Sequence, residues 1–187
     1  SEINVLSSEE VTVQQALDGI ELDYSATPDF LSLFNQQVQA DPSGIAVICG
    51  EQQLTYAELD SRSNQMAKLL LSEGVGPGDR VVICMQRQTG LILGWMATLK
   101  AGACYIPADA HYPQERLAHL LSDSGAKLLI SEQSLIDELP EFAGEILTIE
   151  GLTTLSTEYD TARPAVSRQP HDPFYIIYTS GSTGLPK

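Results

Sequence analysis

The sequence predicts an α/β fold in which a largely parallel sheet is flanked by helices. Three observations lead to this prediction. Short apolar runs of strand length alternate with longer stretches of helical periodicity, and Gly and Pro separate the two kinds of segment. The chain of 187 residues is also long enough to bury a hydrophobic core, and its 43% hydrophobic and 19% charged residues are typical of a globular protein.

The first helix is expected to begin at Thr27, Pro28 and Asp29, with Thr27 as N-cap, Pro28 at the first helical position and an acid in the first turn. A single apolar stripe should follow at helical spacing, made of Phe30, Leu33, Phe34 and Val38. Residues 1–26 are polar and acidic, and we interpret them as a linker. A short strand is expected at residues 45–49, followed by a turn at residues 50–52 that leads into residues 54–56.

A second helix should begin after Thr55, because Thr55 and Glu58 have the spacing of a capping box. Its apolar face consists of Leu59, Met66, Ala67, Leu70 and Leu71, and glycines from Gly74 onward end it. Further strands are expected at residues 80–85, 104–107, 127–130, 146–149 and 174–179, the last of them buried. Further helices are expected at residues 88–101, where Trp95 should pack in the core, and from Pro113 to Gly125.

The formal net charge of −15 argues against a partner that is a nucleic acid or an anionic membrane, since such binding needs clustered Lys and Arg. The charge is unevenly distributed. Residues 1–60 carry eleven acids and residues 132–160 carry eight, and neither block contains Lys or Arg. Residues 61–131 and 161–187 each have a net charge of +2. The net charge of the whole chain is therefore no argument against an anionic substrate near the end of the chain.

Several other classes are disfavoured. The longest apolar run, residues 91–99, is too short to cross a bilayer, and the acidic N-terminus does not fit a secretory signal peptide, so we expect a cytoplasmic protein. Cys49, Cys84 and Cys104 are odd in number and lie in apolar stretches, which indicates reduced, buried thiols. The three histidines lack metal-ligand spacing, so no metal site is expected. The missing initiator Met and the end at Lys187 suggest a fragment of a longer chain.

The most informative stretch is the end of the chain, where the expected strand 174–179 runs into a loop of hydroxyls and glycines followed by Lys187. Glycines let consecutive backbone amides point at one anion, hydroxyls add donors, and the lysine adds a positive charge. This composition is that of a phosphate-binding loop placed where α/β folds bind ligands. It is not a Walker A loop, because Gly181 and Gly184 are only three positions apart. On composition alone a flexible turn is an equally good interpretation.

The complete sequence of residues 178–187 favours the phosphate-binding loop over the flexible turn. Residues 178–187, YTSGSTGLPK, closely resemble the phosphate loop of the adenylate-forming superfamily. Residues 54–59, LTYAEL, resemble the first core motif of nonribosomal peptide synthetase adenylation domains, and residues 99–109, LKAGACYIPAD, resemble the second. The resemblance covers residues 27–187, with departures at Cys104, Ala108 and Ala110 that preserve size or polarity.

The resemblance implies that residues 27–187 are the N-terminal part of the large subdomain of an adenylation domain, truncated at the phosphate loop, and that residues 1–26 are an upstream interdomain linker. It implies activation of an amino acid with ATP and Mg²⁺ and transfer to the phosphopantetheine thiol of a carrier domain, with a condensation domain upstream. Thr179, Ser182, Thr183 and Lys187 would hold the β- and γ-phosphates, and Ser180, Gly181 and Gly184 would shape the loop. The family's catalytic lysine lies beyond Lys187, so the chain alone is expected to be inactive.

Two alternatives stay open at this point. Acyl-CoA synthetases and other stand-alone adenylate-forming ligases share the phosphate loop, although the form of the second motif and the linker-like residues 1–26 favour a multimodular synthetase. The chain could also be a non-catalytic structural or interaction piece. The sequence identifies neither the amino acid nor the peptide product.

Overall fold

The computed structural model describes residues 7, 10, 12–13, 28–169 and 171–179. The helices are α2 (Phe30–Ala40), α3 (Tyr56–Ser72), α4 (Thr89–Lys100), α5 (Gln114–Asp123) and α6 (Ile149–Leu155), with short 3-10 helices at Gln133–Glu138 and Ser156–Glu158. The strands are β1 (Ile45–Cys49), β2 (Gln52–Thr55), β3 (Arg80–Met85), β4 (Cys104–Asp109), β5 (Leu128–Ser131) and β6 (Glu145–Thr148). Four strands form a parallel sheet in the order β4-β3-β5-β6, and β1 and β2 form an antiparallel hairpin. The predicted α/β class is confirmed.

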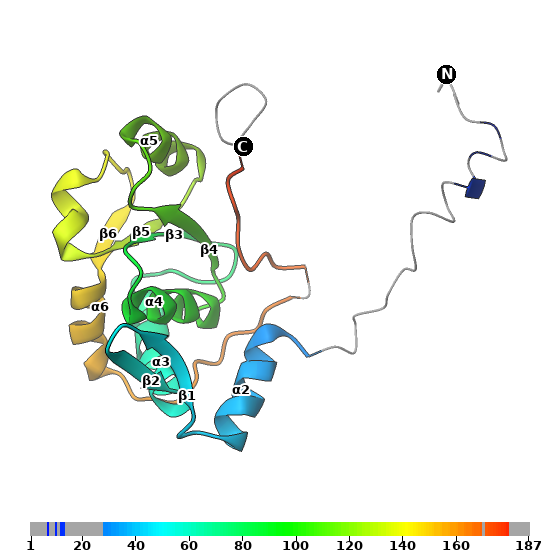
Figure 1. The fold of residues 1–187 in the computed structure, drawn as a ribbon, viewed down its shortest axis with the longest axis vertical. Helices are drawn as coiled ribbons and strands as arrows, with labels where there is room; N and C mark the ends of the chain where they lie inside the picture. Colours follow the sequence, from blue (N-terminus) through cyan, green and yellow to red (C-terminus); the bar gives the residue numbers. More distant parts are fainter. Residues whose placement is uncertain (1–6, 8–9, 11, 14–27, 170, 180–187) are drawn as a thin grey trace.

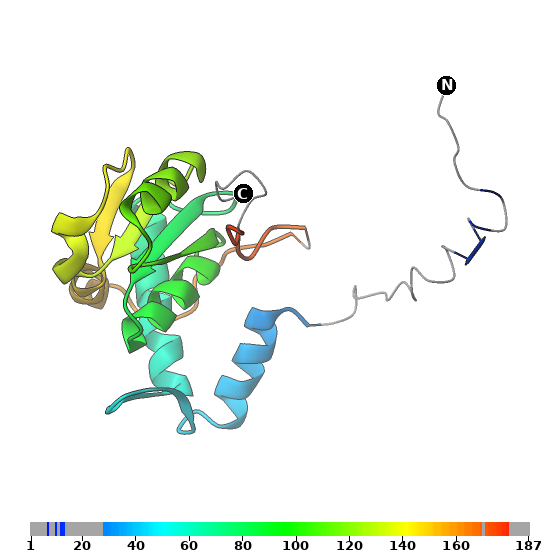
Figure 2. The same ribbon diagram turned by 45° about the horizontal axis from the view of Figure 1, so that its top comes forward.

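The sheet lies between two layers of helices, as Figures 1 and 2 show. Side chains alternate along β3, so that Val81, Ile83 and Met85 join the core shared with α3, α4 and α6. Val82 and Cys84 face the other way, into the core beneath α5. Both faces of β3 are therefore buried, which explains why its sequence is a continuous apolar run rather than an alternating one.

The start of α2 differs from the prediction. Asp29, not Thr27, is the N-cap, and its side chain accepts a hydrogen bond from the Ser32 backbone amide at 2.7 Å. Pro28 therefore precedes the cap, and Thr27 lies outside the described residues. The stripe is also different: Leu31 is the buried residue, while Phe30 and Leu33 are exposed. Asp caps a helix as well as Thr does, so residue type alone could not decide between the two positions.

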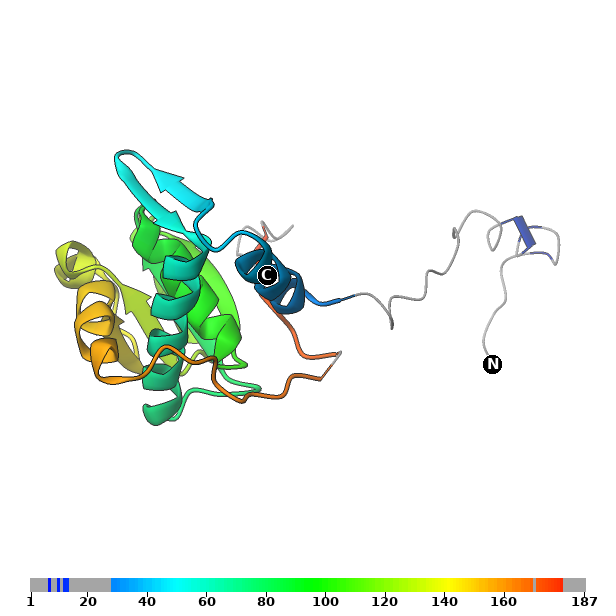
Figure 3. The same cartoon turned by 90° about the horizontal axis from the view of Figure 1, so that it is seen from below.

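The hairpin β1–β2 leads directly into α3, and Figure 3 shows both from below. The predicted capping box is present: the Thr55 amide donates to Glu58 Oε2 at 2.8 Å, and the Glu58 amide donates to Thr55 Oγ1 at 3.2 Å. Cys49 is only half-buried, contrary to prediction, because it lies in this two-stranded hairpin outside the main sheet. Cys84 and Cys104 are buried, and all three thiols are free.

The remaining elements are close to their predicted positions. Strand β4 extends two residues further than predicted, to Asp109, and Ile149 begins α6 instead of ending β6. Trp95 packs against the core as expected, with its ring stacked on Phe30 at a centroid distance of 5.8 Å. None of the helices in the described part of the chain combines the length and apolarity that a membrane crossing requires.

The predicted strand at residues 174–179 is wrong in two respects. The segment is bonded to β4 through a single parallel bridge, between Tyr105 and Tyr175, so it is not a regular strand. It is also not buried, because Tyr175 is 54% and Ile177 56% exposed. Ile176 and Tyr178 pack against the core beneath α5. The alternation expected of an extended chain is therefore present, but only one of its two faces is covered.

Candidate functional site

The predicted phosphate loop begins where the described chain reaches Thr179. Thr179 is exposed. The other predicted site residues, Ser180, Gly181, Ser182, Thr183, Gly184 and Lys187, lie outside the described residues. The structure therefore shows how the chain approaches the loop, and it leaves the loop contacts themselves as predictions.

The segment that leads into the loop, residues 174–179 (the approach), runs beside β4 in the same direction. The Tyr105 amide donates to the Phe174 carbonyl at 3.1 Å, and the Ile176 amide donates to the Tyr105 carbonyl at 3.0 Å. Because this bridge is parallel, counting four residues onward gives Asp109 on β4 and Thr179 on the approach. Both residues therefore lie toward the carboxyl edge of the sheet, the edge where open α/β sheets bind their ligands.

A side-chain hydrogen bond fixes the approach immediately before Thr179. The Tyr178 hydroxyl donates to Asp123 Oδ2 at 2.7 Å, and Asp123 is the last residue of α5. Partial burial, together with this bond to the Asp123 carboxylate, raises the pKa of Tyr178 to about 12. Tyr178 thus remains a neutral donor throughout the physiological pH range.

A cleft of about 630 Å³ opens at the same edge, lined by the ends of β3 and β4 and by Ile177 and Tyr178. Its lining includes the side chains of Arg87, Asp109 and His111. The backbone amide of His111 donates to Asp109 Oδ1 at 2.9 Å, and the His111 ring lies 3.0 Å from the same oxygen. These two contacts, the backbone one foremost, lower the pKa of Asp109, so the carboxylate stays charged beside the approach.

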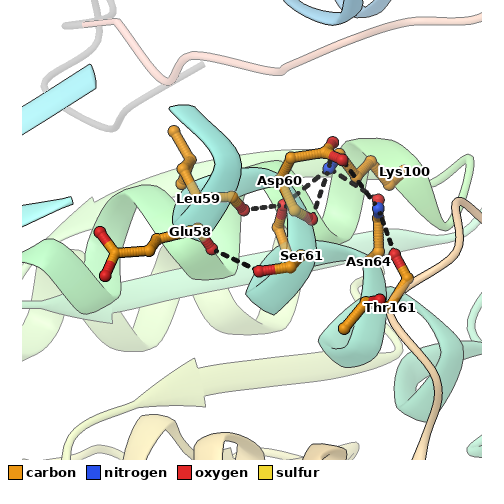
Figure 4. Close-up of polar contacts among 8 residues, drawn as sticks. Glu58, Leu59, Asp60, Ser61, Asn64, Lys100 and Thr161 are labelled. Carbon is orange, nitrogen blue, oxygen red and sulfur yellow. Dashed lines mark hydrogen bonds and ion pairs between the residues drawn. The ribbon is translucent and has the colours of Figure 1, made fainter. Parts of the chain in front are cut away.

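Lys100 of the second motif and α3, the helix that begins within the first motif, meet in a buried polar cluster, drawn in Figure 4. Lys100 Nζ donates to Asp60 Oδ1 at 2.6 Å, Ser63 Oγ at 2.8 Å and Asn64 Oδ1 at 2.7 Å. The Lys100 side chain is 1% exposed. Burial lowers its pKa to about 8, and the contacts with Asp60 oppose that shift. The cluster joins α3 to α4 through these contacts.

The same cluster reaches the chain that leads back to the approach. Asn64 Nδ2 donates to the Thr161 carbonyl at 2.9 Å, and Gln65 Nε2 donates to the Tyr159 carbonyl at 2.7 Å. Sequence reasoning did not single out Lys100 or Asn64. The available signal was a lysine at the end of an otherwise apolar helix, directly before a Gly turn, where a charge has to find partners.

Comparison with known proteins agrees with this geometry. Residues 34–187 match the family of AMP-binding enzymes, and the chain belongs to that family. It is 41% identical over its full length to gramicidin S synthase 2 of Brevibacillus brevis, of which it spans 4%. It is 40% identical over its full length to tyrocidine synthase 3 of Brevibacillus parabrevis, of which it spans 3%. The chain thus corresponds to a small part of the curated relatives that it matches.

Solved structures give the same assignment. The N-terminal subdomain of Klebsiella oxytoca NpsA has a TM-score of 0.74 and 30% identity, over 83% of this chain and 39% of that one. The nonribosomal peptide synthetase FmoA3 in its AMPPNP-bound form has a TM-score of 0.78 and 30% identity, over 93% of this chain and 18% of that one. Within the AMP-binding family, the chain is therefore adenylation-domain sequence of the nonribosomal peptide synthetase type.

Proposed function

We propose that this chain is the N-terminal portion of an amino-acid-activating adenylation domain. In the reaction, an oxygen of the amino-acid carboxylate attacks the α-phosphorus of ATP, the bond to the bridging oxygen breaks, and pyrophosphate leaves. The phosphopantetheine thiol of a carrier domain then attacks the carbonyl carbon of the aminoacyl-AMP and displaces AMP. The observation that supports this most directly is the YTSGSTGLPK sequence at residues 178–187, entered from a segment that runs parallel to β4 toward the ligand-binding edge.

The loop residues have two roles in this proposal. Thr179, Ser182, Thr183 and Lys187 bind the β- and γ-phosphates and stabilise the charge that develops on the departing pyrophosphate. Ser180, Gly181 and Gly184 give the backbone the curvature that brings its amides to the phosphates. Mg²⁺ accompanies the ATP phosphates, and we assign no metal ligand and no catalytic residue to this chain.

The domain boundaries and partners belong to the same proposal. Residues 1–26 form the linker from an upstream condensation domain, and residues 27–187 belong to the adenylation domain. The partners are the amino acid, the carrier domain and that condensation domain, in a cytoplasmic multimodular enzyme. The isolated chain is expected to be inactive, since the substrate-selecting residues and the catalytic lysine belong to family segments that follow the phosphate loop.

The experiment is a substrate panel on an intact adenylation domain that contains this chain. We expect ATP–pyrophosphate exchange that depends on an amino acid and none that depends on a fatty acid. Turnover of fatty acids with coenzyme A instead would move the protein to the acyl-CoA synthetase branch. An absence of exchange with every carboxylate would favour a non-catalytic role.

A further inference from the structure

The approach to the phosphate loop has few main-chain restraints of its own. Between Phe174 and Thr179 two backbone hydrogen bonds connect it to β4, both at Tyr105, and one of its faces is exposed. Regular strands fix their position through a ladder of such bonds and through burial on both faces. The position of Thr179 therefore depends on side chains that hold the approach at its two ends.

Arg168 holds the beginning of the approach. Its Nη2 donates to the Pro173 carbonyl at 2.8 Å, and its Nη1 donates to the Ala103 carbonyl at 3.2 Å. A longer contact of 3.4 Å joins Nη1 to the Leu99 carbonyl in the last turn of α4. The guanidinium also lies over the Phe174 ring, 4.4 Å from its centroid. One planar cation thus joins the end of α4, the loop before β4 and the start of the approach.

Asp123 holds the end of the approach. It accepts the Tyr178 hydroxyl at 2.7 Å, and Tyr178 is the residue immediately before Thr179. Asp123 ends α5, whose Leu117, Leu120 and Leu121 are buried against the sheet. The carboxylate therefore belongs to a helix that is packed against the sheet. Its hydrogen bond holds Tyr178, the residue before Thr179, against the end of that helix.

We propose that Arg168 and Asp123 are positioning residues for the phosphate-binding loop. They act through Phe174 and Tyr178 and do not contact the nucleotide. Arg168 fixes the entry of the approach relative to α4, and Asp123 fixes its exit relative to α5. This proposal rests on the proposed function, because positioning has a kinetic consequence only if the loop binds ATP.

The test uses an intact adenylation domain containing this chain and measures ATP–pyrophosphate exchange over a range of MgATP and amino-acid concentrations. Asp123→Ala should raise the KM for MgATP by about ten-fold, which corresponds to the loss of one charge-assisted hydrogen bond. Arg168→Gln should raise it by at least as much, since Arg168 donates more than one hydrogen bond. The KM for the amino acid should stay within about two-fold. A merely structural role would reduce the active fraction and leave both KM values unchanged.

Conservative variants sharpen the test. Asp123→Asn keeps an acceptor for the Tyr178 hydroxyl and should restore most of the MgATP affinity lost in Asp123→Ala. Arg168→Lys keeps the positive charge but loses the planar guanidinium that donates to two carbonyls at once, so its KM for MgATP should stay raised. Tyr178→Phe removes a single hydroxyl, so it should fold normally and show the same MgATP effect as Asp123→Ala. Asp160→Ala is the matched control, since Asp160 pairs with Lys68, away from the approach.

The possible outcomes separate the two proposals. If the unmodified domain exchanges pyrophosphate but Tyr178→Phe and Arg168→Gln keep its KM for MgATP, the positioning proposal is wrong and the proposed function stands. If Asp123→Asn is as impaired as Asp123→Ala, the carboxylate charge matters rather than the position, and the proposal is again overturned. If the unmodified domain shows no exchange with any carboxylate, the proposed function itself fails.

Discussion

Replacing Lys100 with Met should destabilise the protein far more than the same change at Lys68. Both lysines pair with an aspartate, but Lys100 is 1% exposed and Asp60 24%, whereas Lys68 is 19% exposed and its partner Asp160 74%. Met retains most of the aliphatic stem, so the comparison isolates the ammonium group. The difference tests whether the cluster between α3 and α4 stabilises the fold.

The magnitude follows from what Lys100→Met leaves behind. The amide oxygen of Asn64 loses its bond to Nζ, and a buried acceptor without a partner costs about 1 to 3 kcal/mol. The Asp60 carboxylate keeps one bond from Asn64 Nδ2 at 3.1 Å but loses its counter-ion. Breaking a buried pair from one side costs about 3 to 5 kcal/mol, so we expect about 3 kcal/mol here because Asp60 retains some solvent. For the exposed Lys68 pair we expect about 0.5 kcal/mol.

The assay is urea unfolding, followed by the fluorescence of the single tryptophan, Trp95, which lies in α4 and stacks on Phe30. The midpoint should fall sharply for Lys100→Met with the m-value unchanged. Adding Asp60→Asn to Lys100→Met should recover part of the loss, since it removes the uncompensated charge. Equal midpoints for Lys100→Met and Lys68→Met would refute the reasoning.

Three further predictions concern pH, a glycine and the thiols. The pKa of Lys100 is lowered from its ordinary value of 10.5 to about 8 in the folded state. Between pH 8 and pH 10.5 the unfolded chain therefore binds more protons at this lysine than the folded chain does. The stability of the unmodified protein relative to Lys100→Met should therefore rise by up to about 3 kcal/mol across that window in urea titrations, and a constant difference would contradict this. Gly102→Ala should cost about 1 to 3 kcal/mol in the same titrations, because its φ is +86° and a Cβ would lie 2.7 Å from Val166 Cγ1. Gly50→Ala, with φ +59° and nothing within 4 Å, should cost less, and equal costs would show that crowding at Gly102 is unimportant. Mass spectrometry after iodoacetamide treatment at pH 8 should show Cys49 labelled first, since burial raises the pKa of Cys84 to about 11; labelling of Cys84 without prior unfolding would contradict its placement.

Much of the fold follows from local patterns in the sequence. Strand β3 and the capping box at Thr55 were predictable because continuous apolar runs and short-range caps act locally. The segment 174–179 was mispredicted as a buried strand, because its apolar composition does not say how many neighbours it pairs with. Asp29 rather than Thr27 caps α2, and residue type could not decide between them because both are good capping residues, two positions apart.

The site was predictable to a lesser degree. The loop at residues 179–187 was found because glycines, hydroxyls and a lysine follow one another in the sequence. The partners of its approach were not found, because Asp123 and Tyr178 are 55 residues apart and Arg168 reaches Ala103 across 65 residues. Such pairs arise only when the sheet brings distant segments together, and no local spacing indicates them.

The most direct test of the central claim is pyrophosphate exchange by the intact adenylation domain with Lys187→Ala, with Lys127→Ala as the control. Lys127 is a partly exposed lysine paired with Asp79, so its loss should leave exchange within about two-fold. Lys187→Ala should lower amino-acid-dependent exchange by about 100-fold or more, since it removes a positive charge from the phosphates of the transition state. Thr183→Ala should also lower it. Undiminished exchange in Lys187→Ala would contradict the assignment of residues 179–187 as the phosphate-binding loop.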